Sequence, residues 1–242
     1  MISYTLGKEY DAAQSLPEKI YKAIQSSPDI IVFAFSGYKG SGKSHYANKL
    51  ADNIDIYLSE EDYWINRVIS FADPLKSAVS DLFDIPTNHF YESKFKDTIV
   101  PKYNKTPRQL LQWFGTEIMQ TEFARFLGYS DRLLWVNKCI YKEVEYMVDT
   151  DESYKNIIII DDLRFAHEQA ALIKYFGRKS ISFIRVINTT IPPYTPEEKA
   201  ALHVSETEHE SLEVDYTINN DMTSIDHSFL TNIAKSLYNT IE

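Results

Sequence analysis

"IIVFAFSGYKGSGKSHYANKL", residues 30–50, is the stretch that decides the fold. Its first six residues are all apolar and predict a buried strand, and the residues from about Lys43 onward predict a helix. Between them lie three of the seven glycines of the chain. The segment 37–44 fits the pattern G-x-x-x-x-G-K-[ST] in the strand-then-helix setting that this pattern requires. These residues therefore predict a phosphate-binding loop.

The chemistry of phosphate binding explains the glycines. Phosphate oxygens need several converging donors, and glycine lets backbone N–H groups point inward without a Cβ in the way. Lys43 is expected to reach the β- and γ-phosphates, and the Ser44 hydroxyl to help hold Mg²⁺. ATP and Mg²⁺ are the expected cofactors; the alternative is an ordinary glycine-rich turn. The residues expected to bind them are Gly37, Lys39, Gly40, Ser41, Gly42, Lys43, Ser44 and His45.

The composition restricts the class of protein. With 242 residues, 44% of them apolar, the chain is long enough for one large globular domain. Its net charge of −10 argues against a protein that coats nucleic acid. The chain has no apolar run of about 18 residues and no basic, apolar leader, so we expect neither a transmembrane helix nor a signal peptide. The single cysteine, Cys139, is expected to be a buried thiol in a reducing, cytoplasmic setting.

Expected strands and helices alternate along the chain. This order predicts an α/β domain with a parallel sheet covered by helices on both faces. Gly177 is expected to close one of the helices. The expected strands are 30–35, 67–73, 156–164, 180–188 and 215–220, and the expected helices are 9–26, from 43, 74–83, 106–127, 131–147, 165–176 and from 223.

The helix expected at 106–127 has a clear start signal. Thr106 can cap it, Pro107 suits its first position, and Gln109 completes a capping box. The apolar residues expected to be buried are Leu111, Phe114, Ile118 and Phe126, followed in the next helix by Leu133, Val136, Ile140, Val144 and Met147.

Polar residues on these two helices are candidates for nucleotide binding. Arg108, Gln112 and Thr116 recur at i, i+4 and i+8 and form a stripe. An arginine fork suits a phosphate and a glutamine can pair with a base edge, although a solvated helix face has the same pattern. Arg132 and Trp135 share a face of the second helix, where a cation beside a flat ring suits a nucleotide; Trp135 could equally be a core residue.

The run "IIIIDDLR", residues 157–164, ends an expected strand with charged residues. Either Asp161 or Asp162 could orient Mg²⁺ through water, with the other capping the next helix. Arg164 follows the strand end, where open α/β sheets bind ligands, although it could also be an exposed surface arginine. The acidic stretch 205–215 is expected to be solvated, and its His209 is not expected to bind metal.

Eight short motifs follow one another in an order typical of a known family. They are "SGYKGSGKS", "FADPLKSAV", "RQLLQWFGTE", "DRLLWV", "IDDLRFAHE", "FIRV", "HVSE" and "DYTINND", and they span about residues 33 to 222. In this combination the chain resembles the deoxynucleoside monophosphate kinases of tailed bacteriophages. The resemblance implies the three-layer P-loop NTPase fold of nucleoside monophosphate kinases. It also implies transfer of the γ-phosphate of ATP to a deoxynucleoside 5′-monophosphate, supplying precursors for phage DNA synthesis.

The same resemblance assigns roles to the residues that match the family motifs. The catalytic residues would be Lys43, Arg132, Asp162, Arg164 and Arg185, and the metal would be held by Ser44 and Asp162. The residues that bind the acceptor would be Asp73, Lys76, Arg108, Gln112, Thr116, Arg132, Trp135, Arg164 and Glu206. The implied domains are a helical lead-in at 1–28 and one kinase domain at 29–242, with an acceptor-binding helical region at about 84–150 and a lid-like segment at about 188–213.

Two features depart from the family pattern, and other functions stay open. The lead-in has no counterpart that we can place, and residues 188–202 contain no arginine, although related lids often carry some.

One alternative is a P-loop kinase for another small phosphorylated acceptor. An ATP-driven nucleic-acid module is disfavoured by the net charge and by the lack of a basic aromatic stripe. A non-catalytic interaction protein is disfavoured by the intact Lys43, Ser44 and Asp162.

The expected partners are small molecules. They are ATP and a deoxynucleoside monophosphate, with no stable binding to nucleic acid or to a membrane. The aromatic-rich segment 83–104 is also compatible with a homodimer.

Overall fold

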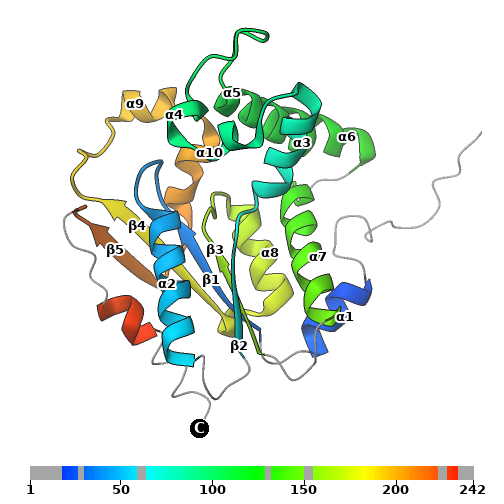
Figure 1. The fold of residues 1–242 in the computed structure, drawn as a ribbon, viewed down its shortest axis with the longest axis vertical. Coiled ribbons are helices and arrows are strands. Elements are labelled where there is room, and N and C mark those ends of the chain that lie inside the picture. The colour runs from blue at the N-terminus through cyan, green and yellow to red at the C-terminus, as the bar shows by residue number, and fades with distance from the viewer. Residues whose placement is uncertain are drawn as a thin grey trace, which may run out of the picture.

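A parallel five-stranded sheet forms the centre of the molecule (Figure 1). The computed structural model describes residues 18–26, 30–58, 64–128, 132–149, 155–222 and 228–233. The strand order is β2-β3-β1-β4-β5, and every neighbouring pair is parallel. The strands are β1 (Ile30–Ser36), β2 (Trp64–Ile69), β3 (Lys155–Ile160), β4 (Ile181–Asn188) and β5 (Tyr216–Asn220).

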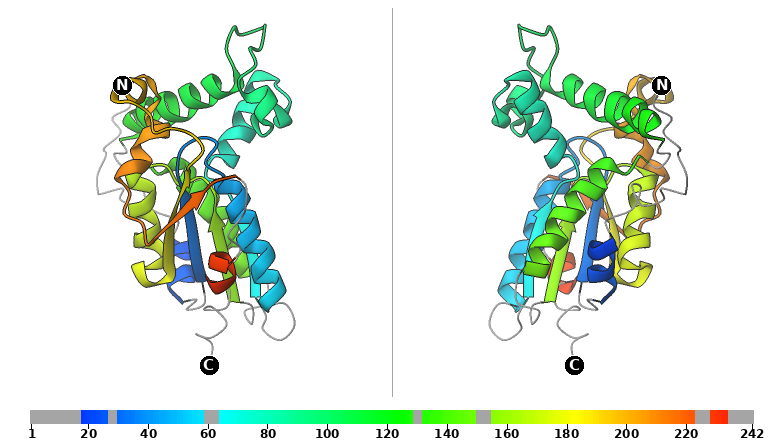
Figure 2. Two further views of the ribbon diagram at one scale, coloured as in Figure 1. Left: turned by 90° about the vertical axis from the view of Figure 1, so that its left-hand side faces the viewer. Right: turned by 90° about the vertical axis from the view of Figure 1, so that its right-hand side faces the viewer.

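Helices cover both faces of this sheet, which Figure 2 shows nearly edge-on. Along β1, Val32 and Ala34 face one apolar cluster, whereas Phe33 and Phe35 face another. Strands buried on both faces are continuous apolar runs, as β1 and β3 are. The first cluster packs against α1 (Glu18–Ser26), α7 (Leu134–Asp149) and α8 (Ala166–Phe176), and the second against α2 (Lys43–Leu58) and the helical residues 228–233. These layers confirm the expected α/β class and three-layer fold.

A further group of helices lies above the carboxyl ends of the strands and is called here the upper helical layer (Figure 1). It has its own apolar core, which includes Val79, Phe90 and Leu110, and Trp135 of α7 joins that core. Its elements are α3 (Asp73–Phe83), η2 (Thr87–Phe90), α4 (Ser93–Lys96), α5 (Pro107–Gln112), η3 (Trp113–Phe123) and α6 (Ala124–Leu127). The layer therefore covers the edge of the sheet at which the parallel strands end.

The long helix predicted from residue 106 begins as expected and then changes type. Thr106 Oγ1 accepts the backbone N–H of Gln109 across 3.2 Å, and the Gln109 side chain returns the contact, which confirms the capping box. From Trp113 to Phe123 the backbone is a π-helix. Its wider turn shifts the positions that face inward, so the predicted apolar stripe is wrong at Phe126, which is 83% exposed.

The π-helix also brings small and polar residues into the interior. The residues buried here are Gly115, Gln120 and Ala124, whereas Leu111, Phe114 and Ile118 are half-buried. A Cβ on Gly115 would lie 2.5 Å from Leu75 Cδ2, so this segment passes very close to α3. In the next helix the predicted core is confirmed, since Val136, Ile140 and Val144 are buried.

Several element boundaries differ from the prediction; the strand expected at 156–164, for example, ends at Ile160. The second strand was expected at 67–73, but β2 ends at Ile69 and α3 begins at Asp73, because Pro74 favours the first turn of a helix. The first helix is described only from Glu18, and the start of the last predicted helix, at 223, lies outside the described residues. Gly177 closes α8 at φ 80°, as predicted.

The acidic stretch 205–215 is solvated only in part: Glu210, Ser211, Glu213 and Asp215 are exposed as expected, whereas other residues of the stretch turn inward. It begins with α10 (Val204–Thr207) and η5 (Glu208–Ser211), and Ser205, Glu206 and His209 are buried. Glu206 is drawn inward because its carboxylate pairs with Arg164. The chain reaches this segment from β4 through an exposed turn and α9 (Pro196–Ala201).

Two other features bear on expectations from composition. Cys139 is buried, and burial raises the pKa of its thiol, which confirms the buried thiol predicted from the sequence. None of the helices among the described residues is long and apolar enough to cross a membrane.

Candidate active site

The loop Gly37–Ser44 joins β1 to α2 and lies against the ends of β4 and β5. Gly37 has φ 140°, and a Cβ there would lie 2.3 Å from Val186 O. Gly42 has φ 100°, and its Cβ would lie 2.6 Å from Asn220 Nδ2. Both positions therefore require glycine for conformation and for space. The N-terminus of α2 follows at once, and its first turn carries no acidic residue that would offset the helix dipole.

Lys43 lies across the inside of this loop. Its ammonium donates to the carbonyl of Gly37 at 2.7 Å and to that of Tyr38 at 2.8 Å. Burial, and then the nearby Arg164, lower the pKa of Lys43 from 10.5 to about 8. Carboxylates at Glu206, Asp162 and Asp161 act in the opposite direction. Because burial here disfavours the charged form of the amine, an anionic ligand would stabilise the ammonium and raise its pKa again.

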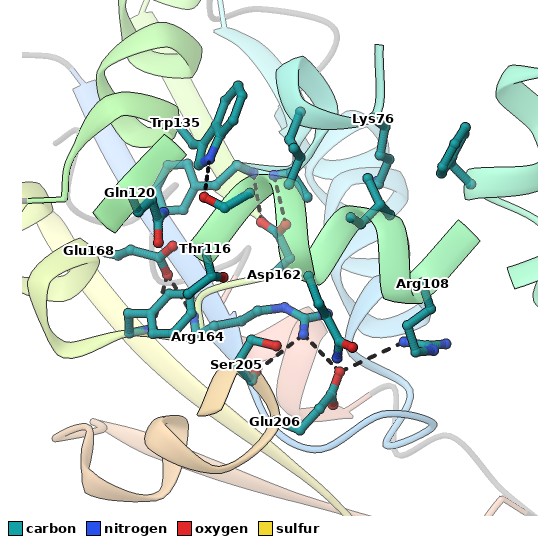
Figure 3. Close-up of a pocket in the computed structure, with 18 of the residues that line it drawn as sticks. Lys76, Arg108, Thr116, Gln120, Trp135, Asp162, Arg164, Glu168, Ser205 and Glu206 are labelled. Atoms are coloured by element: carbon teal, nitrogen blue, oxygen red, sulfur yellow. Dashed lines mark hydrogen bonds and ion pairs between the residues drawn. The ribbon is translucent and has the colours of Figure 1, made fainter. Parts of the chain in front are cut away.

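A cavity of about 130 Å³ lies between the upper helical layer and the end of β3 and is called here the first cavity (Figure 3). The predicted stripe Arg108, Gln112 and Thr116 lines this cavity and does not form a solvated face. The other sequence-predicted residues in its wall are Lys76, Trp135, Asp162, Arg164 and Glu206. Polar lining residues that the sequence analysis did not single out are Lys96, Gln120, Glu168 and Ser205.

Two arginines converge on one carboxylate in this cavity. Arg164 Nη1 donates to Glu206 Oε1 at 2.9 Å and to the Ser205 carbonyl at 3.2 Å (Figure 3). Arg108 Nη1 lies 3.7 Å from the same Glu206 oxygen. Burial opposes the charge of Glu206, but Arg164 outweighs it, so the pKa of Glu206 lies below its ordinary value. The pair of guanidinium groups thus forms an anion site that an internal carboxylate occupies.

The adjacent aspartates at the end of β3 have different surroundings. The carboxylate of Asp162 accepts the backbone N–H of Phe71 at 2.7 Å and that of Ala72 at 3.0 Å, just before α3. Burial, with the neighbouring charge of Asp161, raises the pKa of Asp162. Asp161 instead accepts the Ser70 hydroxyl through one oxygen. Asp162 therefore caps α3, and both of its oxygens are used by the backbone.

Glu168 accepts the backbone N–H groups at the start of α8, the helix that Asp161 or Asp162 was expected to cap. It is buried and accepts the backbone N–H groups of Arg164 at 2.8 Å and Phe165 at 3.0 Å. Burial and the charge of Asp162 raise the pKa of Glu168 to about 8. The i, i+3 position of Glu168 in this first turn was the signal that could have identified it.

Arg132 and Arg185 do not line the first cavity, and Arg185 lines the second one described below. Arg132 has φ 55°, lies 5.1 Å from the centre of the Phe165 ring, and donates to Gln120 Oε1 at 3.3 Å. It thus orients a side chain of the first cavity without lining that cavity. Arg185 Nη2 donates to three carbonyls, of His209, Glu210 and Leu212, at 2.7 to 3.3 Å. These hydrogen bonds join residues 209–212 to β4.

The remaining predicted residues lie at the edges of the site. Asp73 pairs with Lys76 across 2.8 Å and accepts the hydroxyl of Tyr91 at 2.9 Å. Ser44 and His45 are exposed in the first turn of α2. Trp135 is at once a core residue and a wall of the first cavity, and its Nε1 donates to the Gly115 carbonyl at 3.2 Å.

A second cavity, of about 350 Å³, lies beside the loop Gly37–Ser44 and the end of β4. Aromatic and apolar side chains form much of its wall; Tyr38 has its ring centre 5.0 Å from that of Tyr194 and 4.5 Å from that of His209. Among the described residues, Ser41 Oγ, Arg185 Nε and both ring nitrogens of His209 are buried without a hydrogen-bond partner. Burial and the nearby charge of Lys43 lower the pKa of His209 to about 4, so its imidazole is neutral at pH 7. Loop residues Gly37, Tyr38, Lys39 and Ser41 line this second cavity, whereas the first cavity is lined by residues that follow β2 and β3 and by the upper helical layer.

Comparison with known proteins gives one informative similarity. No protein-family model matches the chain. Over 154 residues it is 30% identical to a protein of Acanthamoeba polyphaga mimivirus that is named "Putative deoxynucleotide monophosphate kinase". The aligned region covers 61% of this chain and 70% of the mimivirus protein.

Proposed function

Because the chain belongs to the deoxynucleotide monophosphate kinase family, we propose that it transfers the γ-phosphate of ATP to a deoxynucleoside 5′-monophosphate. The products are ADP and the deoxynucleoside diphosphate, a precursor for phage DNA synthesis in line with the tailed-phage resemblance. One observation carries the proposal: two arginines converge in one cavity, and the phosphate-binding loop lines a second, larger cavity with aromatic walls.

The acceptor occupies the first cavity. Its phosphate dianion takes the position between Arg108 and Arg164 where Glu206 now supplies the negative charge. Its base lies toward Gln112 and Trp135, which offer an amide and a flat ring in the same cavity.

The donor has its triphosphate in the loop and its nucleoside in the second cavity. The aromatic walls at Tyr38 and Tyr194 suit a flat base. The unpartnered polar atoms of Ser41 and His209 can each bond to an edge of the base or to the sugar.

The donor set at the loop fits Mg²⁺. Ser44 and Asp161 are the residues that would hold it, and Asp161 also contributes to the field at Lys43. Mg²⁺ in kinases takes one or two carboxylate ligands together with phosphates and waters, so this small set suffices. When bound, the ion neutralises charge on the β- and γ-phosphates. Of the two candidate aspartates we propose Asp161 for the metal, because each oxygen of Asp162 already accepts a backbone N–H group.

Phosphoryl transfer needs positioning and charge neutralisation more than acid–base chemistry. The acceptor phosphate is already ionised near neutral pH and serves as the nucleophile. Lys43 holds the donor phosphates, and Arg164, which pairs with Glu206 and whose charge acts on Lys43, neutralises charge between donor and acceptor. Arg132 and Arg185 are positioning residues, since they hold Gln120 and the 209–212 segment.

The test is a coupled ADP-release assay with ATP and Mg²⁺. Each of dAMP, dGMP, dCMP and dTMP and their ribonucleotide counterparts is offered in turn, with Lys43→Ala as the control. Turnover on at least one deoxynucleotide that is lost in the control is the expected result. Tight ATP binding with no turnover on any nucleotide contradicts the proposal and favours a kinase for another small phosphorylated acceptor.

A further inference from the structure

Asp97 connects the phosphate-binding loop to the first cavity. It follows α4 in the upper helical layer, and no sequence motif singled it out. Its Oδ2 accepts Lys39 Nζ, from the loop, at 2.6 Å. Its Oδ1 accepts Arg108 Nε, from α5, at 2.8 Å. One carboxylate thus joins the two walls that would hold donor and acceptor.

The connection continues through the first cavity. Arg108 Nη1 approaches Glu206 Oε1 at 3.7 Å, and the same oxygen accepts Arg164 Nη1 at 2.9 Å (Figure 3). Basic and acidic side chains therefore alternate from the loop to the end of β3. Every basic member of this series lies in the loop or in the first cavity, where phosphates are expected.

The ion pairs of Asp97 orient the Lys39 and Arg108 side chains, and their exposure to solvent lets these side chains change partners when a ligand binds. The side chains of Asp97 and Lys39 are about half exposed, at 50% and 53%, and solvent screens such pairs. The hydrogen bonds from Arg108 and Lys39 lower the pKa of Asp97 to about 2, so its carboxylate is charged at any pH near neutral. Because Arg108 uses its Nε for Asp97, its Nη1 stays available to approach Glu206 Oε1, at 3.7 Å.

We propose that Asp97 is a positioning residue that couples the two nucleotide sites. This inference rests on the proposed function. A donor phosphate that binds Lys39 restricts the motion of that side chain. Through Asp97 this restriction extends to the Arg108 side chain, so Arg108 loses less conformational freedom when it binds the acceptor phosphate. Binding of donor and acceptor is consequently cooperative, and the coupling depends on the carboxylate and not on the fold of the layer.

Calorimetric titration of the full chain measures this coupling directly. The probes are adenosine 5′-(β,γ-imido)triphosphate with Mg²⁺, which cannot transfer its γ-phosphate, and the four deoxynucleoside monophosphates. Typical coupling between two sites changes affinity roughly 5- to 150-fold, so we expect the acceptor to bind at least about five-fold more tightly with the ATP analogue present. In Asp97→Asn, whose amide can accept from one partner only, this ratio is expected to fall close to one.

A control variant tests whether loss of any exposed carboxylate in the upper helical layer would weaken the coupling. Glu92→Gln removes an exposed carboxylate of the same layer that pairs with Lys94, and it is expected to keep the coupling of the unmodified chain. An unchanged ratio in Asp97→Asn, or equal acceptor affinity with and without the analogue in the unmodified chain, overturns the inference and leaves the proposed function standing. Failure of every deoxynucleoside monophosphate to bind overturns both.

Discussion

Arg164 donates to one carboxylate oxygen of Glu206 across 2.9 Å, joining the residues after β3 to helix α10 in the wall of the first cavity. The pair combines a structural role with the chemical role proposed for Arg164. It draws an acidic segment inward, and it holds a guanidinium beside the phosphate-binding loop. The two roles can be separated by substitution.

Arg164→Ala is expected to lower kcat by roughly 10³- to 10⁵-fold, the range known for an arginine that stabilises a phosphoryl-transfer transition state. It should also lower the free energy of unfolding by about 1–3 kcal/mol, because the buried Glu206 carboxylate loses its main partner. The double variant Arg164→Ala/Glu206→Gln removes that unpaired charge. Thermal melting should show recovered stability while the kinetic assay shows none; recovery of both would deny Arg164 a chemical role.

Asp161 and Asp162 are expected to differ when each is changed to asparagine. Asp162→Asn should lower the free energy of unfolding by about 1–2 kcal/mol, because an amide nitrogen cannot accept one of the two backbone N–H groups before α3. Asp161→Asn should instead raise the Mg²⁺ concentration needed for half-maximal turnover. Thermal melts and Mg²⁺ titrations of both variants make the comparison. A raised Mg²⁺ requirement confined to Asp162→Asn would reverse our assignment.

The pKa of Lys43, lowered to about 8, predicts a proton linked to nucleotide binding. Without ligand the ammonium loses its proton as pH rises through about 8, whereas bound phosphates stabilise the charged form and raise the pKa again. At pH 8.5 binding of ADP with Mg²⁺ should therefore take up a proton. Calorimetry in two buffers with different ionisation enthalpies measures this uptake, and Lys43→Arg, which stays charged, should show none.

The same lowered pKa affects stability with a definite sign. Between about 8 and 10.5 the unfolded chain binds more protons at this lysine than the folded chain does. The cost of burying the ammonium is therefore present below pH 8 and is relieved as pH rises toward 10.5. Chemical unfolding at pH 7.5 and 9.5 should show a smaller loss of stability at high pH for the unmodified chain than for Lys43→Met.

Two loop glycines are expected to respond differently to alanine. Gly37→Ala places a Cβ 2.3 Å from a backbone oxygen of β4, so the loop must move away from the sheet. Gly40 has φ 76°, but its Cβ would meet nothing within 4 Å, so its substitution costs only the roughly 1–2 kcal/mol of a left-handed residue. Thermal melting should rank Gly37→Ala as clearly the less stable. Equal melting temperatures would show that the loop shifts easily.

Filling the second cavity is expected to weaken binding of the donor nucleoside. Ile191 lines this cavity and is half exposed, so Ile191→Trp can occupy the cavity without disturbing the core. ATP should bind at least about ten-fold more weakly, whereas inorganic tripolyphosphate, which needs only the loop, should bind as before. Competition with a fluorescent nucleotide measures both affinities. Equal ATP affinity in the variant would remove the nucleoside from this cavity.

Features that depend on neighbouring residues could be predicted from the sequence. The apolar run before Ser36 and the glycines after it specify a strand, a loop and a helix through local conformation alone. The capping box at Thr106 and the closing Gly177 are equally local, and both are present in the structure. The stripe at Arg108 was predicted from helical spacing, although its alternatives could not be separated until the cavity beneath it was known.

Other features depend on partners far along the chain. Asp162 accepts N–H groups about 90 residues away, and no local pattern indicates that both its oxygens are occupied. The change to a π-helix at Trp113 moved Phe126 outward, because packing against α3 overrides the ordinary helical period. Charge patterns alone predicted a solvated acidic segment, whereas Glu206 and His209 within it are buried, where they meet Arg164 and Arg185.

The sequence by itself determined the glycine-rich loop after β1, the alternation of strands and helices, and the chemical types available at the strand ends. These follow from backbone sterics and from the period of apolar residues, which act over a few positions. Only the tertiary structure decided which carboxylate meets which cation: Asp162 with the backbone before α3, Glu206 with Arg164, and Asp97 between Lys39 and Arg108. Pairing of charges depends on distance and burial in space, and these are set when separate segments pack together.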